Sequence, residues 1–314
     1  MNRLAIVVPC YNEEEVINET ATRFKALLKR LIEAKKILDS SYVLFVNDGS
    51  NDTTWDIISE LHNLDKTFNG INLAKNVGHQ NALVAGLNFV SDSCDIAISI
   101  DADLQDDINA IEEMVDAYDE GYDIVYGVRS SRKKDSFFKK HTALLFYKIM
   151  LFLGVNTIYN HADYRLMSKR AIKQFMLYGE KNMFIRGVVP LIGYKTKKVY
   201  YKRESRFAGE SKYPLRKMIN FAVDGITSFS VKPIRFIFII GFICLIFSFA
   251  SLIYILISYN QGNTVPGWTS VMISLWFLGS ITILSLGIIG EYIGKIYSEV
   301  KRRPSYNIET VLFD

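Results

Sequence analysis

The chain has 314 residues, of which 49% are hydrophobic, and its formal net charge is +4. This length is enough to bury the core of one α/β domain and leaves apolar sequence over. The small net charge argues against a nucleic-acid partner. Three scattered cysteines, Cys10, Cys94 and Cys244, argue against a disulfide framework. The first apolar run is short and interrupted by Pro9, so no cleaved signal peptide is expected.

Two strand–loop–helix units open the chain. Residues 4–8 and 42–46 are apolar runs typical of buried strands, and each ends in a polar loop. Apolar positions at helical spacing follow them over 13–38 and 52–63. This repetition predicts a parallel sheet with helices on its faces, in which the polar loops lie together at the carboxyl edge.

A third apolar run, 96–100, leads directly into Asp101-Ala102-Asp103-Leu104-Gln105. Two carboxylates held this close repel each other unless a cation lies between them. A hard divalent ion such as Mg²⁺ or Mn²⁺ fits, because such sites combine one or two carboxylates with substrate phosphates. The alternative is a plain turn whose aspartates cap the next helix.

These three loops, at 7–13, 46–50 and 101–105, resemble the N-terminal motifs of glycosyltransferase family two, the inverting GT-A enzymes. The match is closest to the polyprenyl-phosphate branch, which includes dolichyl-phosphate mannose synthases and bactoprenol glucosyltransferases. The resemblance implies a Rossmann-like GT-A domain with a mostly parallel sheet. It implies that the metal is held by Asp101, Asp103 and Gln105. The residues it assigns to the nucleotide sugar are Pro9, Tyr11, Glu13, Asp48, Asp101, Ala102 and Arg129.

Residues 160–168 resemble the family's D-F-R-L-M-S stretch, with Tyr164 in place of the usual Phe. The resemblance places Asp163 at the sugar–phosphate junction. In many inverting transferases such a carboxylate is the general base, but a lipid phosphate has a second pKa of about 6 and is mostly ionised already. Asp163 is therefore expected to position the substrate or to act as a weak base. The alternative is a structural cap for the helix after Ser168.

A dianionic acceptor and a nucleotide diphosphate bring several negative charges together, so cationic side chains are needed nearby. The family's G-x-R, F-I-R-G and R-x-x-G-x-S-K-Y motifs have counterparts at 127–129, 184–187 and 206–213. The residues expected to bind phosphate or acceptor are Arg165, Arg186, Arg203, Arg206, Ser211, Lys212 and Tyr213, and Arg206 joins Asp103 and Asp163 as a catalytic candidate. Any single arginine among them could instead be a solvated surface charge. The four histidines, His62, His79, His141 and His161, show no metal-ligand spacing and are read as non-ligands.

Two segments, 236–258 and 268–290, contain no charged residue. Each is long enough to cross a hydrocarbon core about 30 Å thick, and the uncharged linker between them predicts a transmembrane hairpin. Basic residues flank the pair on the outer side of both segments, which places both termini and the catalytic domain in the cytoplasm at the plasma membrane.

The expected organisation has three parts. A cytoplasmic catalytic domain spans 1–212, an amphipathic interface helix spans 213–231, and the hairpin with a basic cytoplasmic tail spans 232–314. A further apolar helix with a basic start, 136–154, is expected either at the membrane interface or in the core of the soluble domain.

The predicted function is inverting transfer of a sugar from a nucleotide-diphosphate sugar to a polyprenyl phosphate, with a divalent metal as cofactor. UDP-glucose is the preferred donor, while UDP-GlcNAc, UDP-galactose and GDP-mannose stay open. A processive polysaccharide synthase is the rival enzyme, but its Q-x-x-R-W signature is absent; a catalytically silent nucleotide-binding scaffold is the rival from another class. A dehydrogenase is excluded because no G-x-G-x-x-G occurs. Assembly into a homo-oligomer is left open.

Overall fold

The computed structural model describes residues 1–130, 161–180, 185–203 and 267–313, together with isolated positions between 234 and 257. Both predicted interface helices, 136–154 and 213–231, lie outside the described residues. About half of the predicted first span, 236–258, also lies outside them, as does the loop 259–266 that joins the spans.

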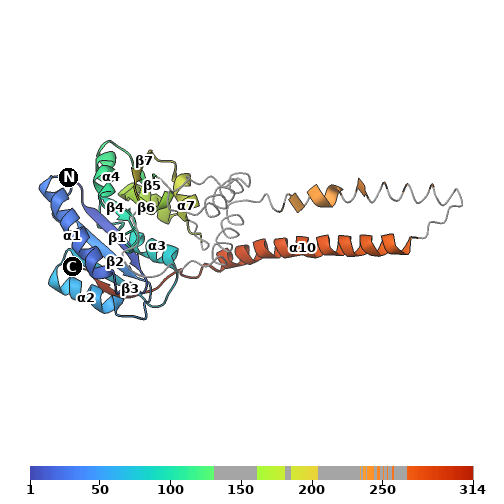
Figure 1. Cartoon of the computed structure of the whole chain (residues 1–314), viewed down its shortest axis with the longest axis horizontal. Helices are drawn as coiled ribbons and strands as arrows, with labels where there is room; N and C mark the ends of the chain where they lie inside the picture. Colours follow the sequence, from blue (N-terminus) through green and yellow to red (C-terminus); the bar gives the residue numbers. More distant parts are fainter. Residues whose placement is uncertain are drawn as a thin grey trace.

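An eight-stranded sheet forms the centre of the domain, in the order β7-β5-β6-β4-β1-β2-β3-β8 (Figure 1). Its strands are β1 (Leu4–Cys10), β2 (Tyr42–Asn47), β3 (Phe68–Leu73), β4 (Ile96–Ser99), β5 (Ile124–Arg129), β6 (His161–Ser168), β7 (Thr196–Tyr201) and β8 (Ile308–Leu312). Strand β1 pairs in parallel with both β2 and β4, and β2 pairs in parallel with β3. Strand β6 runs antiparallel between β4 and β5, and β8 runs antiparallel to β3. The mixed, mostly parallel sheet is the GT-A arrangement that the resemblance implied.

Helices cover both faces of this sheet, which explains why its central strands read as continuous apolar runs. The helices are α1 (Ile17–Glu33), α2 (Thr54–Leu64), α3 (His79–Val90), α4 (Ala110–Asp119), α6 (Lys169–Met176), the short α7 (Ile185–Val188) with the 3₁₀ turn η1 (Val189–Ile192), and α10 (Trp268–Lys301). Alternate residues of β1 point to opposite faces: Leu4, Ile6 and Val8 pack with α1 and α4, whereas Ala5 and Val7 pack with α3 and α6. The sheet therefore separates two apolar cores.

The chain changes direction across the sheet at β1, because β2 lies on one side of it and β4 on the other. In open α/β sheets, ligands bind beyond the carboxyl ends of the strands at such a switch point. The loops after β1, β2 and β4 meet there, as the sequence predicted.

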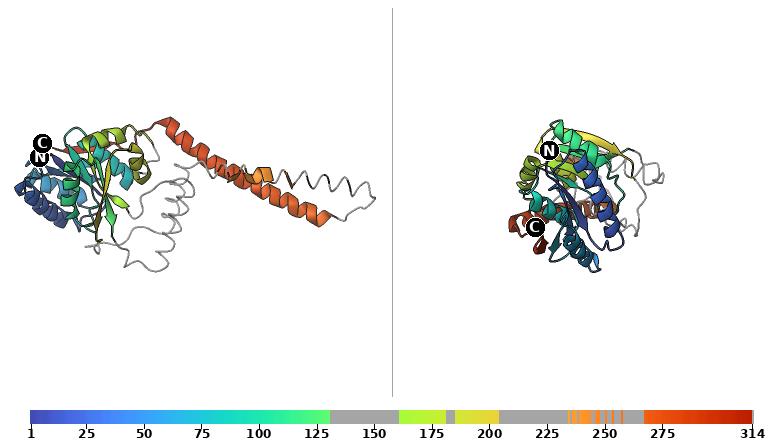
Figure 2. Two further views of the ribbon diagram at one scale, coloured as in Figure 1. Left: turned by 90° about the horizontal axis from the view of Figure 1, so that it is seen from above. Right: turned by 90° about the vertical axis from the view of Figure 1, so that its left-hand side faces the viewer.

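Helix α10 extends away from the sheet domain as one continuous helix (Figures 1 and 2). Among the described residues, one helical segment is long and apolar enough to cross a membrane, Phe277–Lys301 of α10, with a mean hydropathy of 1.6 and none of its apolar window buried. The predicted second span, 268–290, lies in the same helix, but the helix continues eleven residues further, to Lys301. Outward-facing apolar side chains over this length indicate an association with the membrane.

After α10 the chain returns to the sheet, where β8 pairs with β3. This end of the chain was predicted to be a basic tail, and that prediction is incomplete because residues 308–312 form an edge strand. Both termini consequently lie on the sheet domain, away from the far end of α10 (Figure 1).

Candidate functional site

The loops after β1 and β2 hold each other through backbone and side-chain hydrogen bonds. The Asn12 N–H donates to Ser50 Oγ at 2.9 Å, and the Asn51 N–H donates to Asn12 Oδ1 at 2.9 Å. Asn12 has a positive φ of 52°, a conformation that asparagine tolerates better than most residues. The two loops thus form one rigid wall at the switch point.

The carboxylates of Asp101 and Asp103 are turned outward because the residues between and after them are anchored inside. Ala102 and Leu104 are 3% and 5% exposed, and the Thr20 hydroxyl of α1 donates to the Ala102 carbonyl at 2.9 Å. The side chain of Ala102, predicted to help bind the nucleotide sugar, packs in the core. Its observed contribution is to set the direction of its two neighbours.

Asp101 lies among other carboxylates. Burial, together with Asp106, Asp163 and Asp103, raises its pKa to about 6, although His79 opposes this. Such crowding is the condition that a divalent cation relieves. Asp101 and Asp103 therefore fit a metal chemically.

The described residues contain no group of three or more His, Cys, Asp and Glu side chains arranged to hold a metal ion. An ion at Asp101 and Asp103 would thus need further ligands from the substrate diphosphate, as is usual for Mg²⁺. Gln105, the third predicted ligand, accepts a hydrogen bond through Oε1 from Arg203.

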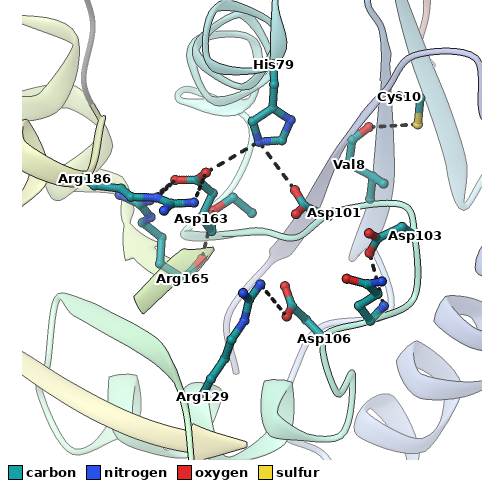
Figure 3. Close-up of polar contacts among 12 residues, drawn as sticks. Val8, Cys10, His79, Asp101, Asp103, Asp106, Arg129, Asp163, Arg165 and Arg186 are labelled. Carbon is teal, nitrogen blue, oxygen red and sulfur yellow. Dashed lines mark hydrogen bonds and ion pairs between the residues drawn. The ribbon is translucent and has the colours of Figure 1, made fainter. Parts of the chain in front are cut away.

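Asp163 lies inside a cage of cationic side chains (Figure 3). The Arg165 guanidinium donates to Oδ1 at 2.8 Å, and Arg186 donates to both oxygens, at 3.2 Å and 3.0 Å. His79 Nε2 lies 3.7 Å from Oδ2. Burial would raise the pKa of Asp163, but Arg186, His79 and Arg165 outweigh it and hold that pKa well below its usual range. The carboxylate therefore stays ionised and is a very weak base.

Strand β6 explains this arrangement. Asp163 and Arg165 are two residues apart on one strand, so both side chains point to the same face. Asp163 does not cap the following helix; the hydroxyl of Ser168 does, by accepting from the Ala171 N–H at 3.2 Å. The structural alternative considered for Asp163 is therefore wrong.

Arg165, predicted to bind phosphate or acceptor, is buried below the site rather than displayed in it. Its side chain is 1% exposed, and its Nε and Nη1 atoms have no hydrogen-bond partner among the described residues. A buried guanidinium with one hydrogen-bond partner places a strong positive charge next to that partner. Its observed contact is with Asp163.

Arg129, predicted to bind the nucleotide sugar, belongs to a second polar cluster. It contacts Asp106 Oδ1 at 3.3 Å and the Tyr201 hydroxyl at 3.3 Å, while Tyr201 itself donates to Asp106 Oδ1 at 2.6 Å. Asp106 is almost fully buried. This cluster fixes the far end of the 101–105 loop against β5 and β7.

Asp48, also predicted to bind the nucleotide, is 3% exposed. Its two oxygens accept from the Val77 and Gly78 N–H groups, at 2.7 Å and 3.0 Å. Asp48 therefore holds the loop that leads into α3. Of the other predicted nucleotide contacts, Pro9 is buried in β1, and Tyr11 and Glu13 are half-buried at the start of the loop that follows.

His79 is a site residue that the sequence analysis missed. It is the first residue of α3, and its Nε2 atom lies 3.4 Å from Asp101 Oδ1 as well as near Asp163. Burial would lower the pKa of His79, but the two carboxylates outweigh it and raise the value to about 9. Strand β3 is the feature that could have revealed it. If residues 68–73 had been identified as a parallel strand, the loop after them, which leads to His79, would have been expected at the carboxyl edge of the sheet.

The structure thus brings Asp101, Asp103, Asp163, Arg165 and Arg186 to one edge of the sheet, with Arg203 near Gln105. The remaining predicted contacts, Arg206, Ser211, Lys212 and Tyr213, lie outside the described residues. Their assignment to phosphate or acceptor stays a prediction.

Comparison with known proteins gives two matching families. Residues 5–176 match the profile of glycosyl transferase family 2, and residues 232–296 match that of the GtrB C-terminal hairpin. An uncharacterized glycosyltransferase of Bacillus subtilis (strain 168), YkoT, is 52% identical over 311 residues, covering 99% of this chain and 92% of the relative.

The bactoprenol glucosyl transferase of Shigella phage SfII is 37% identical over 312 residues, covering 98% of this chain and 97% of the relative. Among solved structures, a mannosyltransferase of Pyrobaculum calidifontis in complex with GDP-Man and Mn²⁺ is similar with a TM-score of 0.43 at 15% identity, covering 96% of this chain and 86% of that one.

Proposed function

The chain belongs to glycosyl transferase family 2, and we propose that it transfers glucose from UDP-glucose to undecaprenyl phosphate. The product is a lipid monophosphoglucose, and UDP is released. The observation that carries this proposal is the similarity to bactoprenol glucosyl transferases, which at 37% identity extends over nearly the whole chain. The match to the GtrB C-terminal hairpin supports a lipid acceptor.

Asp101 and Asp103 would hold a divalent ion, Mg²⁺ or Mn²⁺, with Gln105 as the third predicted ligand. When bound, such an ion supplies positive charge to the diphosphate of the donor and so stabilises the leaving nucleotide. The crowding of Asp101 by Asp103, Asp106 and Asp163 supports this assignment, because it favours a cation at that point.

Asp163 would position the reacting groups rather than remove a proton. A general base needs a pKa near the working pH, whereas the pKa of Asp163 is held far below it by Arg165, Arg186 and His79. The acceptor does not require a base, because a phosphate with a second pKa of about 6 is mostly a dianion at neutral pH. The lipid phosphate can therefore attack the anomeric carbon directly.

Cationic side chains would offset the charge of the two phosphate-bearing substrates. Arg186 is the best placed of the described arginines, because its side chain is 33% exposed while it holds Asp163. Arg203, Arg206 and Lys212 are proposed to contact phosphates as well, together with Ser211 and Tyr213.

We further propose two membrane spans with the catalytic domain and both termini in the cytoplasm. The pairing of β8 with β3 puts the end of the chain on the catalytic domain, so both must lie on the same side of the membrane. The basic residues after α10, Arg302 and Arg303, favour the cytoplasmic side.

The test is the transfer of label from a panel of nucleotide sugars to undecaprenyl phosphate by the full-length protein in detergent or lipid. UDP-glucose should give one labelled lipid that resists further extension. A different preferred donor would overturn the choice of sugar, a growing polymer would indicate a processive synthase, and no transfer from any donor would indicate a silent scaffold.

A further inference from the structure

The first two residues of α3 contact three separate parts of the site. His79 lies 3.4 Å from Asp101 and 3.7 Å from Asp163, which come from two different strand ends (Figure 3). The side chain of Gln80 accepts a hydrogen bond from the Ile185 N–H at 3.0 Å, and Ile185 begins the short helix α7 that carries Arg186. The start of α3 thus touches the proposed metal carboxylate, Asp163 and the helix of its arginine partner.

The position of this helix start is fixed from two directions. Asp48 binds the Val77 and Gly78 N–H groups directly before it. Further along α3, Gly86 packs directly on the sheet: a Cβ atom there would lie 2.4 Å from Val7 Cγ1 and 2.7 Å from Val46 Cγ2. A helix held at both points cannot slide along the sheet, so the imidazole of His79 has a defined place.

We infer that His79 is a positioning residue, which holds the carboxylate of Asp163 at a set distance from that of Asp101. This inference rests on the proposed function, because it gives Asp163 its task at the reacting centre. Two carboxylates left alone would repel each other and turn apart. The imidazole of His79 between them attracts both carboxylates, so that Asp163 is in place when the sugar donor and the acceptor bind.

The test is a double-mutant cycle that combines His79→Leu with Asp163→Asn. Leucine has a similar size but carries no N–H group that could interact with the two carboxylates. In the wild-type background we expect kcat to fall on the order of 100-fold, the loss that a misplacement of about 1 Å can cause. In the Asp163→Asn background the same change should alter kcat by no more than about twofold, because residues that act through each other are not additive. His79→Gln keeps an N–H group at similar reach and should retain most of the turnover.

Binding of Mn²⁺ with UDP provides a readout besides activity. Because Asp101 and Asp103 remain, the Kd of Mn²⁺ should be nearly the same for the wild type and His79→Leu. A large loss of Mn²⁺ affinity, equal losses of kcat in both backgrounds, or no loss of kcat at all would each overturn the inference. Should His79→Leu fail to fold, His79→Met, which also lacks an N–H group, gives the same cycle.

The cycle is measured with whichever nucleotide sugar the wild type transfers. If UDP-glucose is not a donor, the proposed function is contradicted. The coupling between His79 and Asp163 can still be measured with the donor that the wild type does use. His62 offers a matched control, since its ring is buried elsewhere and contacts the Phe68 carbonyl at 2.7 Å. His62→Gln should show the same kcat change in both backgrounds.

Discussion

Asp101 and Asp163 lie near the same imidazole, yet their surroundings shift their pKa values in opposite directions. Burial and three other carboxylates raise the pKa of Asp101, whereas two arginines and His79 lower that of Asp163. Different environments give two carboxylates different tasks. A bound cation would stabilise the ionised form of Asp101, whereas the ionised form of Asp163 is already stabilised by Arg165, Arg186 and His79.

The metal assignment predicts a large effect of Asp103→Asn. The substitution keeps the shape of the side chain but removes the negative charge of one carboxylate ligand. The ion that stabilises the leaving diphosphate is then bound more weakly. Turnover should fall at least about a hundredfold, the scale of single electrostatic contacts in transition states. Asp107→Asn is a matched control, because that carboxylate accepts from the Asn109 N–H at the surface. Near-normal activity of Asp103→Asn, or of the wild type in excess EDTA, would contradict the assignment.

The charge state of Asp163 predicts a particular pH profile. The pKa of Asp163 is lowered in the folded protein, so the carboxylate stays ionised from pH 5 to 8. Its titration therefore causes no change of rate in that pH range. The lipid phosphate loses its second proton near pH 6, so the rate should fall on the acidic side of that value.

Asp163→Asn should therefore lower the rate at every pH and keep the acidic limb. If Asp163 were an obligatory base, the limb would disappear with the substitution. Rates of both proteins from about pH 5 to 8 distinguish the two roles, and a flat wild-type profile would contradict both.

At the scale of elements, strand β8 couples the membrane helix to the catalytic sheet. It covers the edge of β3, and Phe313 just after it packs edge-on against Tyr42 and Phe89, with ring centroids 5.3 Å apart in both pairs. Tyr306 accepts a hydrogen bond from Asn88 at 2.9 Å. Phe89 and Asn88 belong to α3, so the end of the chain also supports the helix that carries His79.

Phe313→Ala should lower the free energy of unfolding by about 1–3 kcal/mol, less than a fully buried phenylalanine because the ring is half-buried. Thermal or denaturant unfolding measures this. Thr310→Ala, at an exposed position of the same strand, should change stability by less than about 0.5 kcal/mol. Equal effects of the two substitutions would show that β8 does not depend on the aromatic contact.

The elements that could be predicted were the ones with continuous apolar runs. Strands β1, β2 and β4 were found that way, because both of their faces are buried. Strand β3, which contains Asn69, Gly70 and Asn72, has a broken apolar pattern and was missed, and α3 and His79 were missed with it. Strand β8 has mostly exposed side chains and depends on a pairing partner more than 200 residues away, which no local pattern reveals.

At the site, residue types were easier to predict than contacts. The sequence indicated that Asp163, Arg165 and Arg186 belong to one site, but not that both arginines hold Asp163. Arg129 was likewise assigned to the substrate, whereas in the fold its partner is Asp106. Motifs identify charged residues, while the sheet register decides which charges meet.

The whole molecule joins a catalytic domain to a helix of 34 residues, about 50 Å long at 1.5 Å per residue. That length exceeds the thickness of the hydrocarbon core, about 30 Å. Part of α10 is thus available to separate the domain from the membrane, while the carboxyl edge of the sheet has to meet a lipid phosphate at the membrane surface.

The topology predicts the labelling of single cysteines by an impermeant thiol reagent in intact cells. A cysteine at Asn260 or Asn263, in the loop between the predicted spans, should react from outside. A cysteine at Asn307, exposed next to Tyr306 and β8, should react only after the cells are opened. Native Cys10 and Cys94 are buried and should stay silent. The opposite labelling pattern would put the active site outside, away from cytoplasmic nucleotide sugars.

The identity of the products distinguishes direct displacement by the lipid phosphate from other routes of transfer. The protein is incubated with UDP-glucose and undecaprenyl phosphate, and the lipid and nucleotide products are measured together by mass spectrometry. Direct displacement by the lipid phosphate predicts undecaprenyl monophosphoglucose and an equal amount of UDP. A lipid diphosphate sugar with UMP, or UDP and free glucose with unchanged lipid, would contradict the account.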